Sequence, residues 1–331
     1  MEKILLLPIL LGFFITIFAV PLWIRRAKKV GIVGKDVHKE NGEKLAEAGG
    51  ITVLFGFLIG TLSYVAISTF YFKSADNFVG IFASLCVILI VALIGFIDDI
   101  LGWRIGLNWK SRIVLLIFAS IPLVVINAGE SSMMGFEFGL LYPFLFVPLG
   151  IVATSATFNF LAGYNGLETS QGIILLSALA LVTWLNGSAW LSMINLVMVA
   201  SLCALYFYNR FPAKIFPGNV LTYTIGPLIA ITAILGNIEK IALFFFIPYI
   251  LEVGLKVRGK IKKQSFARVC EDGGLENRYE KFYGLEHIAV HLLNKFKKNS
   301  RAKEYEVVYL INGFQILVIL VGLLLFGSTI F

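Results

Sequence analysis

The sequence has 331 residues, of which 58% are hydrophobic, and its mean hydropathy is +0.87. A soluble domain contains roughly 45–50% apolar residues, so this composition excludes an ordinary soluble protein and indicates an integral membrane protein. The formal net charge of +8 raises the question of a nucleic-acid partner. The distribution of these charges along the chain, described below, argues against one, and we expect no nucleic acid to bind.

The apolar segments are continuous and about 20 residues long, which is the length that an α-helix needs to cross a bilayer. A closed β-barrel gives alternating strands of about ten residues, so the predicted fold is an all-α polytopic membrane protein. We predict a single domain over residues 1–331 with ten transmembrane helices, over residues 3–24, 50–72, 78–97, 111–128, 140–160, 171–186, 188–207, 220–236, 240–257 and 306–330.

The loops between these helices fall alternately on two sides of the membrane, and the two sides differ in charge. One side collects 25 of the 28 Lys and Arg residues, whereas the other retains only Lys3, Lys73 and Lys240. Because positively charged loops stay in the cytoplasm, we predict a cell-membrane protein with both termini outside. Fifteen of the 20 acidic residues also lie on the cytoplasmic side, which the topology rule does not explain. We therefore expect the functional site on that face.

The first cytoplasmic loop carries Lys39 and Glu47 shortly before Gly49 and Gly50. Glycine permits close backbone approach, and the two charged side chains are candidates to face a ligand. An ordinary solvated loop is the alternative for this stretch.

The second cytoplasmic loop begins with two adjacent carboxylates, Asp98 and Asp99, directly after an apolar run that ends at Ile97. Carboxylates are unfavourable in the membrane and mark ion or substrate sites. With Lys110 a few residues on, the pair suits a divalent cation next to bound phosphates, although two solvated acids at a helix end give the same pattern.

The third and fourth cytoplasmic loops add amides, glycines and an aromatic residue. Asn159 interrupts an apolar run at a helix end, where an amide either caps the backbone or supplies an oxygen to a metal. Gly163 opens a loop whose N–H groups can approach phosphates, while Asn165 and the glycine after it also form a good turn. Phe216 either stacks on a nucleobase or anchors the loop at the membrane surface.

The last cytoplasmic loop is long, residues 258–305, and its apolar residues at 276–299 have helical spacing. We predict an amphipathic helix on the membrane surface. His287 and His291 lie four residues apart on it, but with no further ligand nearby a zinc site is disfavoured. A histidine beside phosphate, or a plain interfacial histidine, fits better.

The ordered set of loop motifs resembles the polyprenyl-phosphate N-acetylhexosamine-1-phosphate transferases, and within them the archaeal and eukaryotic branch that uses UDP-N-acetylglucosamine and dolichyl phosphate. The resemblance covers nearly the whole chain and rests on four stretches: Ala46-Glu-Ala-Gly-Gly50, Phe96-Ile-Asp-Asp99 with Lys110, Asn159-Phe-Leu-Ala-Gly-Tyr-Asn-Gly-Leu-Glu168, and Phe216-Pro-Gly-Asn-Val-Leu-Thr-Tyr-Thr-Ile-Gly226.

The resemblance implies transfer of a sugar phosphate from a UDP-sugar to a polyprenyl phosphate, with Mg²⁺ as cofactor and Mn²⁺ as its alternative. It implies that Asn159 contacts the metal, that Asn165 and Phe216 hold the uridine, and that Lys110 contacts phosphate. Of the two carboxylates, which serve the acceptor phosphate, we place Asp99 nearer the metal and Asp98 nearer the acceptor.

This sequence departs from the family pattern at two positions. Asn219 replaces the metal-binding Asp of the fourth loop, so one negative charge is lost although an amide oxygen can still ligate. Gly102 stands where related enzymes often carry Asn or Asp. In the last loop, only His287 and His291 remain of the family's Arg/His cluster.

Three alternatives stay open from the sequence. The first is the same reaction with another UDP-amino sugar, the muramoyl-pentapeptide nucleotide or undecaprenyl phosphate. The second is a transporter, which we disfavour because its functional groups normally lie near the bilayer midplane. The third concerns assembly, since the sequence does not decide between a monomer and a homodimer.

Overall fold

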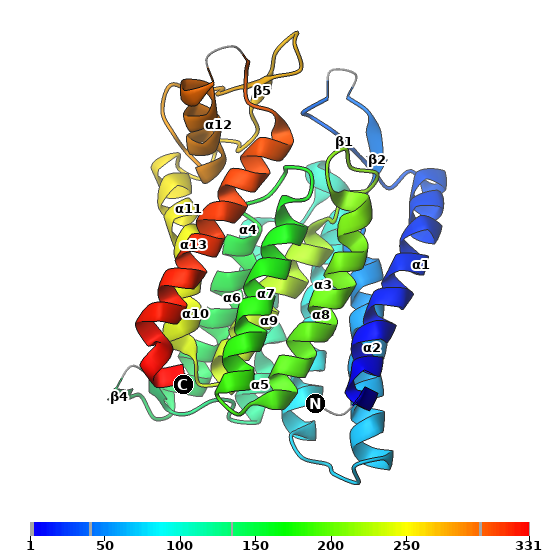
Figure 1. The fold of residues 1–331 in the computed structure, drawn as a ribbon, viewed down its shortest axis with the longest axis vertical. Coiled ribbons are helices and arrows are strands. Elements are labelled where there is room, and N and C mark those ends of the chain that lie inside the picture. Colours follow the sequence, from blue (N-terminus) through cyan, green and yellow to red (C-terminus); the bar gives the residue numbers. More distant parts are fainter. Residues whose placement is uncertain (1–2, 40–41, 134, 298–299, 331) are drawn as a thin grey trace.

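The computed structural model describes residues 3–39, 42–133, 135–297 and 300–330. These residues form an elongated helical bundle with three short two-stranded sheets outside it (Figure 1). Both termini lie at one end of the bundle (Figure 1). The opposite end carries the loops that the sequence places on its charged side, and we call it the loop end.

Six of the described helices are long and apolar enough to cross a membrane, judged by length and composition. They are α1 (Leu6–Val30), α2 (Gly50–Phe70), α3 (Phe78–Ile105), α7 (Leu167–Leu185), α8 (Ala189–Asn209) and α13 (Glu304–Ile330). They coincide with six of the ten predicted spans.

The other four predicted spans are shorter or interrupted. One is the single helix α9 (Asn219–Leu235), and three are pairs of consecutive segments. The pairs are α4 (Trp109–Ala119) with α5 (Ile121–Val125), η2 (Tyr142–Phe146) with α6 (Val147–Phe158), and α10 (Glu239–Phe245) with α11 (Ile247–Arg258). Pro122, Pro143 and Pro248 each stand near the start of a second or irregular segment, where a missing N–H interrupts helical hydrogen bonding.

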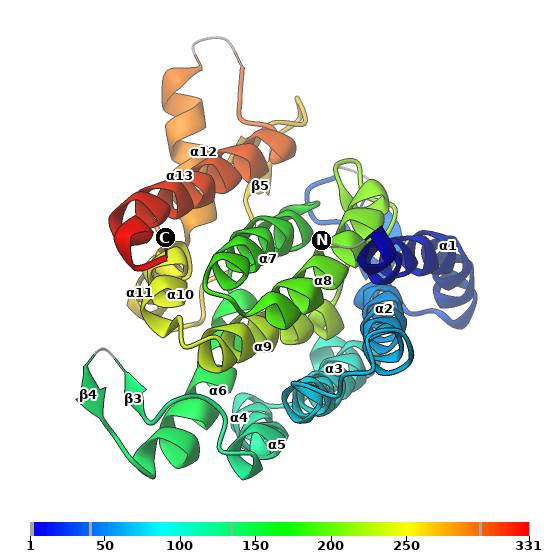
Figure 2. The same cartoon turned by 60° about the horizontal axis from the view of Figure 1, so that its bottom comes forward.

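Helix α9 occupies the centre of the bundle and contacts α2, α3, α6, α7 and α8 (Figure 2). Its neighbours approach closely because two of them present glycine to its first turn. A Cβ on Gly95 would lie 2.6 Å from the carbonyl oxygen of Asn219, and one on Gly50 would lie 2.6 Å from the nitrogen of Leu221. Small residues of this kind allow membrane helices to pack backbone to backbone.

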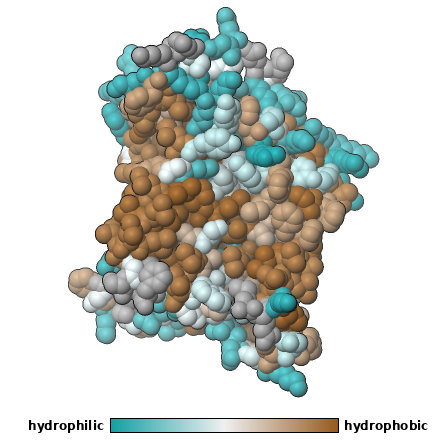
Figure 3. All heavy atoms as spheres, viewed as in Figure 1, coloured by the Kyte–Doolittle hydropathy of each residue, from teal (hydrophilic) through white to brown (hydrophobic). Residues whose placement is uncertain are grey.

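The molecular surface has a broad hydrophobic belt between two hydrophilic ends (Figure 3). Large apolar side chains on the bundle surface are exposed, for example Phe18 in α1 at 70% and Phe70 in α2 at 82%. A soluble protein rarely exposes a continuous patch of this kind, so the belt fits a bilayer. The structure and the composition together therefore describe an integral membrane protein.

Short strands organise the loop end. β1 (Val33–Lys35) pairs antiparallel with β2 (Lys44–Ala46), and Ala46 forms a parallel bridge to Ile215 in the fourth loop. β5 (Arg268–Val269) pairs with β6 (Leu275–Glu276) in the last loop, whereas β3 (Ser132–Met133) and β4 (Phe136–Glu137) lie at the other end.

The amphipathic helix of the last loop is shorter than the sequence pattern predicts. It is α12 (Leu285–Phe296), and the residues at 277–284 before it are not helical, so that part of the prediction over 276–299 is wrong. The helix begins after the extended Gly284, where Glu252 Oε2 accepts a hydrogen bond from Leu285 N at 2.6 Å. Its buried face packs on α11 and α13.

Candidate functional site

The two adjacent carboxylates lie in the loop-end turn of α3, just before the non-helical Gly102. Asp99 accepts hydrogen bonds from the first two backbone N–H groups of α9, with 2.7 Å from Oδ1 to Asn219 N and 3.0 Å from Oδ2 to Val220 N. A carboxylate is favoured there by the unpaired N–H groups and the positive end of the helix dipole. Only glycine fits next to it, because a Cβ on Gly218 would lie 2.4 Å from Asp99 Oδ2.

Asp98 is nearly fully buried and is held by three elements. It accepts from Leu107 N at 2.8 Å and from Asn219 Nδ2 at 2.6 Å, and it forms an ion pair of 2.8 Å with Arg112 Nη2. Arg112 comes from the first turn of α4 and was not selected from the sequence, where it fell inside a predicted span. A cation one turn into an apolar segment was the available signal, because such a residue needs a counterion.

Lys110, which the sequence selected in place of Arg112, lies on the exposed side of the α4 start. Its ammonium stands 5.6 Å from the ring centre of its neighbour Trp109. Among the described residues it forms no ion pair with either carboxylate. Contact between Lys110 and a substrate phosphate stays a prediction.

Asn159 directly follows α6, and a hydrogen bond from Thr222 connects its side chain to the first turn of α9. The hydroxyl of Thr222 is 3.2 Å from Asn159 Oδ1 and 3.2 Å from the carbonyl oxygen of Asn219. Asp98, Asp99, Asn159 and Asn219 thus meet at the start of α9, and we call them the carboxylate–amide cluster. Its donor atoms are hard oxygens of the kind that Mg²⁺ prefers, and Asn219 keeps Oδ1 for a cation because Nδ2 is bonded to Asp98.

The first and fourth loops are joined by backbone hydrogen bonds beside this cluster. Phe216 N donates to Ala46 O at 2.8 Å, and Gly49 N donates to Phe216 O at 2.9 Å. A Cβ on Gly34 would lie within 3.2 Å of both the Phe216 ring and the Glu47 carboxylate, so these two predicted ligand-binding side chains are neighbours. Burial raises the pKa of the Glu47 carboxyl above its usual range.

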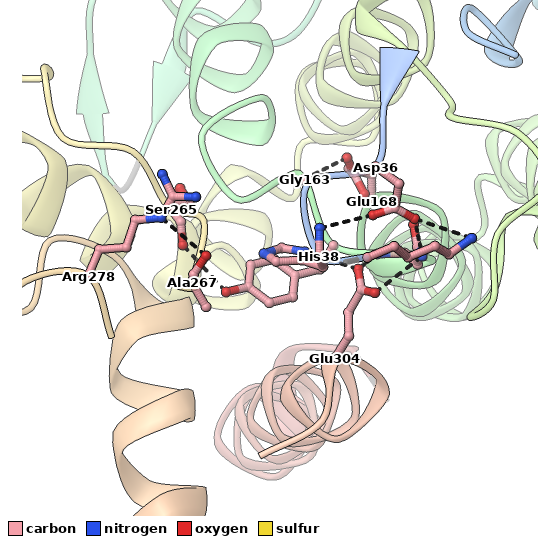
Figure 4. Close-up of polar contacts among 11 residues, drawn as sticks. Asp36, His38, Gly163, Glu168, Ser265, Ala267, Arg278 and Glu304 are labelled. Atoms are coloured by element: carbon pink, nitrogen blue, oxygen red, sulfur yellow. Dashed lines mark hydrogen bonds and ion pairs between the residues drawn. The ribbon is translucent and has the colours of Figure 1, made fainter. Parts of the chain in front are cut away.

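A second group of polar residues, the Asp36–Glu304 cluster, joins the first loop, the third loop and α13 (Figure 4). It comprises Asp36, His38, Asn165 and Glu304, all buried. Asn165 N donates to Glu304 Oε1 at 2.7 Å, and Asn165 Nδ2 lies 3.2 Å from both Asp36 Oδ2 and Glu304 Oε2. His38 Nδ1 is 3.2 Å from Glu304 Oε1. The side-chain atoms of the two acids and the histidine lie within 4.8 Å of one another, so they too can hold a cation.

The Asp36–Glu304 cluster contains residues that sequence reasoning missed. Asp36 and His38 read as ordinary loop residues, and Glu304 lies 266 residues beyond His38, just before a predicted span. No local pattern predicts that contact. Asn165, which we expected at the uridine, has its N–H groups engaged in this cluster instead.

Lys39 and Gly163 lie at the edges of the same cluster. Lys39 Nζ is 3.5 Å from Asp36 Oδ2 and 3.0 Å from Glu43 Oε2. The N–H of Gly163, predicted to approach a phosphate, donates to Glu168 Oε1 at 2.9 Å (Figure 4). Both residues therefore have protein partners in this conformation.

His287 lies in α12 and is buried. Its Nδ1 accepts from Tyr283 N at 3.1 Å, and burial together with the nearby Lys256 ammonium lowers its pKa to about 4. His291 is exposed and contacts the ring of Phe282. The two histidines thus have separate environments, one buried and one exposed.

The apolar belt and the carboxylates and amides gathered at one end define a membrane-embedded protein with a polar site at the end of its helical bundle. Comparison with known proteins identifies the family. The family described as "Glycosyl transferase family 4" matches residues 81–237, which include the carboxylate–amide cluster.

Relatives align over two thirds of the chain or more. A protein of Saccharolobus solfataricus with the provisional name UDP-N-acetylglucosamine–dolichyl-phosphate N-acetylglucosaminephosphotransferase is 36% identical and covers 98% of each chain. A protein of the same name from Dictyostelium discoideum is 28% identical over 67% of this chain and 64% of its own. The phospho-N-acetylmuramoyl-pentapeptide-transferase of Streptococcus equi subsp. zooepidemicus is 30% identical over 73% and 76%. The chain belongs to glycosyl transferase family 4.

Proposed function

We propose that this protein transfers N-acetylglucosamine-1-phosphate from UDP-N-acetylglucosamine to a dolichyl-type polyprenyl phosphate. The products are N-acetylglucosaminyl-diphospho-polyprenol and UMP. The observation that carries the proposal is the carboxylate–amide cluster at the start of α9, in a chain 36% identical to a relative named for this reaction.

In this reaction, an oxygen of the acceptor phosphate attacks the β-phosphorus of the nucleotide. The bond from that phosphorus to the bridging oxygen breaks, and UMP leaves with the electron pair. Both substrates are anionic, so the protein must neutralise charge and align the two phosphates. The acceptor phosphate is already ionised near pH 7, so no strong base is needed.

A divalent cation, Mg²⁺ or Mn²⁺, would supply charge neutralisation at the pyrophosphate. Asp99, Asn159 and Asn219 would hold it, since all three present oxygen atoms around the first turn of α9. Asp98 forms an ion pair with Arg112 and accepts a hydrogen bond from Asn219 Nδ2, so it holds the Asn219 side chain in place. We assign Asp98 to the side of the site where the acceptor phosphate binds.

The remaining predicted residues are assigned to the substrates. We place Phe216 on the uracil ring, and Glu47 next to it. The other assigned residues share the loop end, with Lys110 for phosphate and the set Lys39, Gly163, Asn165 and His287 for the nucleotide and sugar. Asn165 reaches the uridine only if the Asp36–Glu304 cluster opens, because its N–H groups are already bonded.

We further propose that the ten predicted segments all cross the membrane, with the loop end in the cytoplasm and both termini outside. The excess of Lys and Arg at that end supports this orientation. The polyprenyl tail then stays in lipid while its phosphate meets a cytoplasmic nucleotide.

One rival donor has support, because relatives at 30% identity carry the name of the muramoyl-pentapeptide transferase. The test is to incubate purified protein with Mg²⁺, a panel of UDP-sugars, and dolichyl or undecaprenyl phosphate. We expect UMP release with UDP-N-acetylglucosamine and dolichyl phosphate. Release with the muramoyl-pentapeptide nucleotide alone would contradict the proposal.

A further inference from the structure

A cavity of about 430 Å³ opens between the loop-end turns of α8 and α13, next to the residues that precede α7. Figures 1 and 2 show α7 between these two helices. Its walls are aromatic, and two cations border it; the lining includes Tyr206, Phe207, Arg210, Lys214, Tyr305 and Tyr309. A volume of this size lies within the range of sites that bind small molecules or headgroups.

A second cavity of about 270 Å³ adjoins the first and shares Lys214 with it. Arg25 and Lys28, from the last turns of α1, border this second cavity. The two cavities thus meet at Lys214 and are bordered by four cations, Arg25, Lys28, Arg210 and Lys214; we call the pair of cavities the basic groove.

The charge of the basic groove is not balanced by its own acids. Glu43 is the one acidic residue among its lining, and its carboxylate is 3.0 Å from Lys39 Nζ. None of the four groove cations forms an ion pair with an acid in the described part of the chain. A cationic, concave surface of this kind attracts an anion.

The groove lies where the apolar belt meets the polar loop end. Phe207 and Tyr309, on the bundle side of the cations, are 56% and 61% exposed. Exposed aromatic residues next to Lys and Arg are typical of the headgroup level of a membrane. An amphiphile would therefore place its chains along the belt and its charge among the cations.

We propose that the basic groove binds the headgroup of an anionic phospholipid, with its phosphate between Arg210 and Lys214. Arg210 and Lys214 line the larger cavity together with Tyr206 and Tyr305. Guanidinium and ammonium groups bind phosphate strongly, and a tyrosine hydroxyl can donate a further hydrogen bond. This is an accessory lipid site, because no member of the carboxylate–amide cluster lines it.

Asn165, which we assign to the nucleotide, connects the accessory lipid site to the Asp36–Glu304 cluster. This residue lines the larger cavity and also belongs to the Asp36–Glu304 cluster, which joins three loops. Tyr305 follows Glu304 directly in α13, so both groove and cluster use the same helical turn. A bound headgroup would hold this turn and the third loop in place.

The test measures thermal unfolding of the detergent-purified full chain in mixed micelles with phosphatidylglycerol or with phosphatidylcholine. We expect phosphatidylglycerol to raise the Tm of the wild-type protein by several degrees more than phosphatidylcholine does. In the R210Q/K214Q variant this difference should fall below half, and K214Q alone should give an intermediate value. The matched control K262Q/K295Q removes two exposed charges from the same end and should keep the full difference.

Three results would overturn the proposal: a full phosphatidylglycerol effect in R210Q/K214Q, an equal loss in the control, or displacement of phosphatidylglycerol by an equimolar amount of dolichyl phosphate. Native mass spectrometry of the wild-type protein counts the bound lipid and needs no variant to fold. The proposal rests on the membrane placement given above but not on the reaction, because these measurements contain no nucleotide. If the protein released no UMP in the enzyme assay, the expected Tm shifts and lipid counts would stay the same.

Discussion

The ion pair between Arg112 and Asp98 allows the most detailed prediction, because its geometry sets the expected loss. Asp98 is 2% exposed and Arg112 is 31% exposed, and their atoms approach to 2.8 Å. Removing one partner of a buried pair costs about 3–5 kcal/mol. Since Arg112 is partly solvated, we expect Arg112→Met to cost less than a fully buried pair would, about 2–3 kcal/mol.

Thermal unfolding in detergent measures this loss. At about 2 °C per kcal/mol for a chain of this size, the Tm of Arg112→Met should fall by roughly 4–6 °C. Adding Asp98→Asn to Arg112→Met should restore part of the loss, since the buried carboxylate no longer lacks a counterion. A Tm of Arg112→Met equal to that of the wild type would mean that this ion pair does not stabilise the fold.

Three further predictions concern the site and its surroundings. Asp99→Asn should abolish UMP release, because an amide would present N–H groups to the donors of α9; near-normal turnover would remove Asp99 from the proposed site. Phe216→Leu should raise the KM for the nucleotide about tenfold with little change in kcat, as base stacking is worth about 1–3 kcal/mol, and an unchanged KM would mean that Phe216 only anchors the loop. His287 has a pKa lowered to about 4 from the usual 6.5, so its contribution is complete above pH 6.5 and is lost as the pH falls toward 4. Between pH 7 and 5 the Tm of the wild type should therefore fall more than that of His287→Gln, and equal slopes would contradict this.

The parts of the molecule that follow from local pattern were predictable. An apolar run that stops at two carboxylates places Asp98 and Asp99 at a helix end, because hydrocarbon and charge separate at the membrane surface. The positions of the helices follow from the same separation. A break such as the one before Pro248 divides a predicted span into two helices, α10 and α11, but together these helices still extend from one end of that predicted span to the other.

Contacts between distant segments were not predictable from one sequence. The ion pair of Arg112 with Asp98 and the contact of His38 with Glu304 depend on how the loops fold together. The apolar spacing at 276–299 is real, but in the described part of this stretch it runs over a non-helical segment and then over α12, which packs on α11 and α13. Periodicity alone does not separate these.

In the proposed mechanism, Asp99, Asn159 and Asn219 share one divalent cation. Binding of Mn²⁺ in the presence of UMP can be measured by electron paramagnetic resonance. We expect Asn159→Ala and Asn219→Ala each to weaken Mn²⁺ binding at least about tenfold, because each variant loses one of a few ligands. Asn186→Ala, a control at the opposite end of the bundle where its amide donates to Gly236 O, should bind as the wild type does. Wild-type Mn²⁺ affinity in both cluster variants would show that these amides do not ligate the cation.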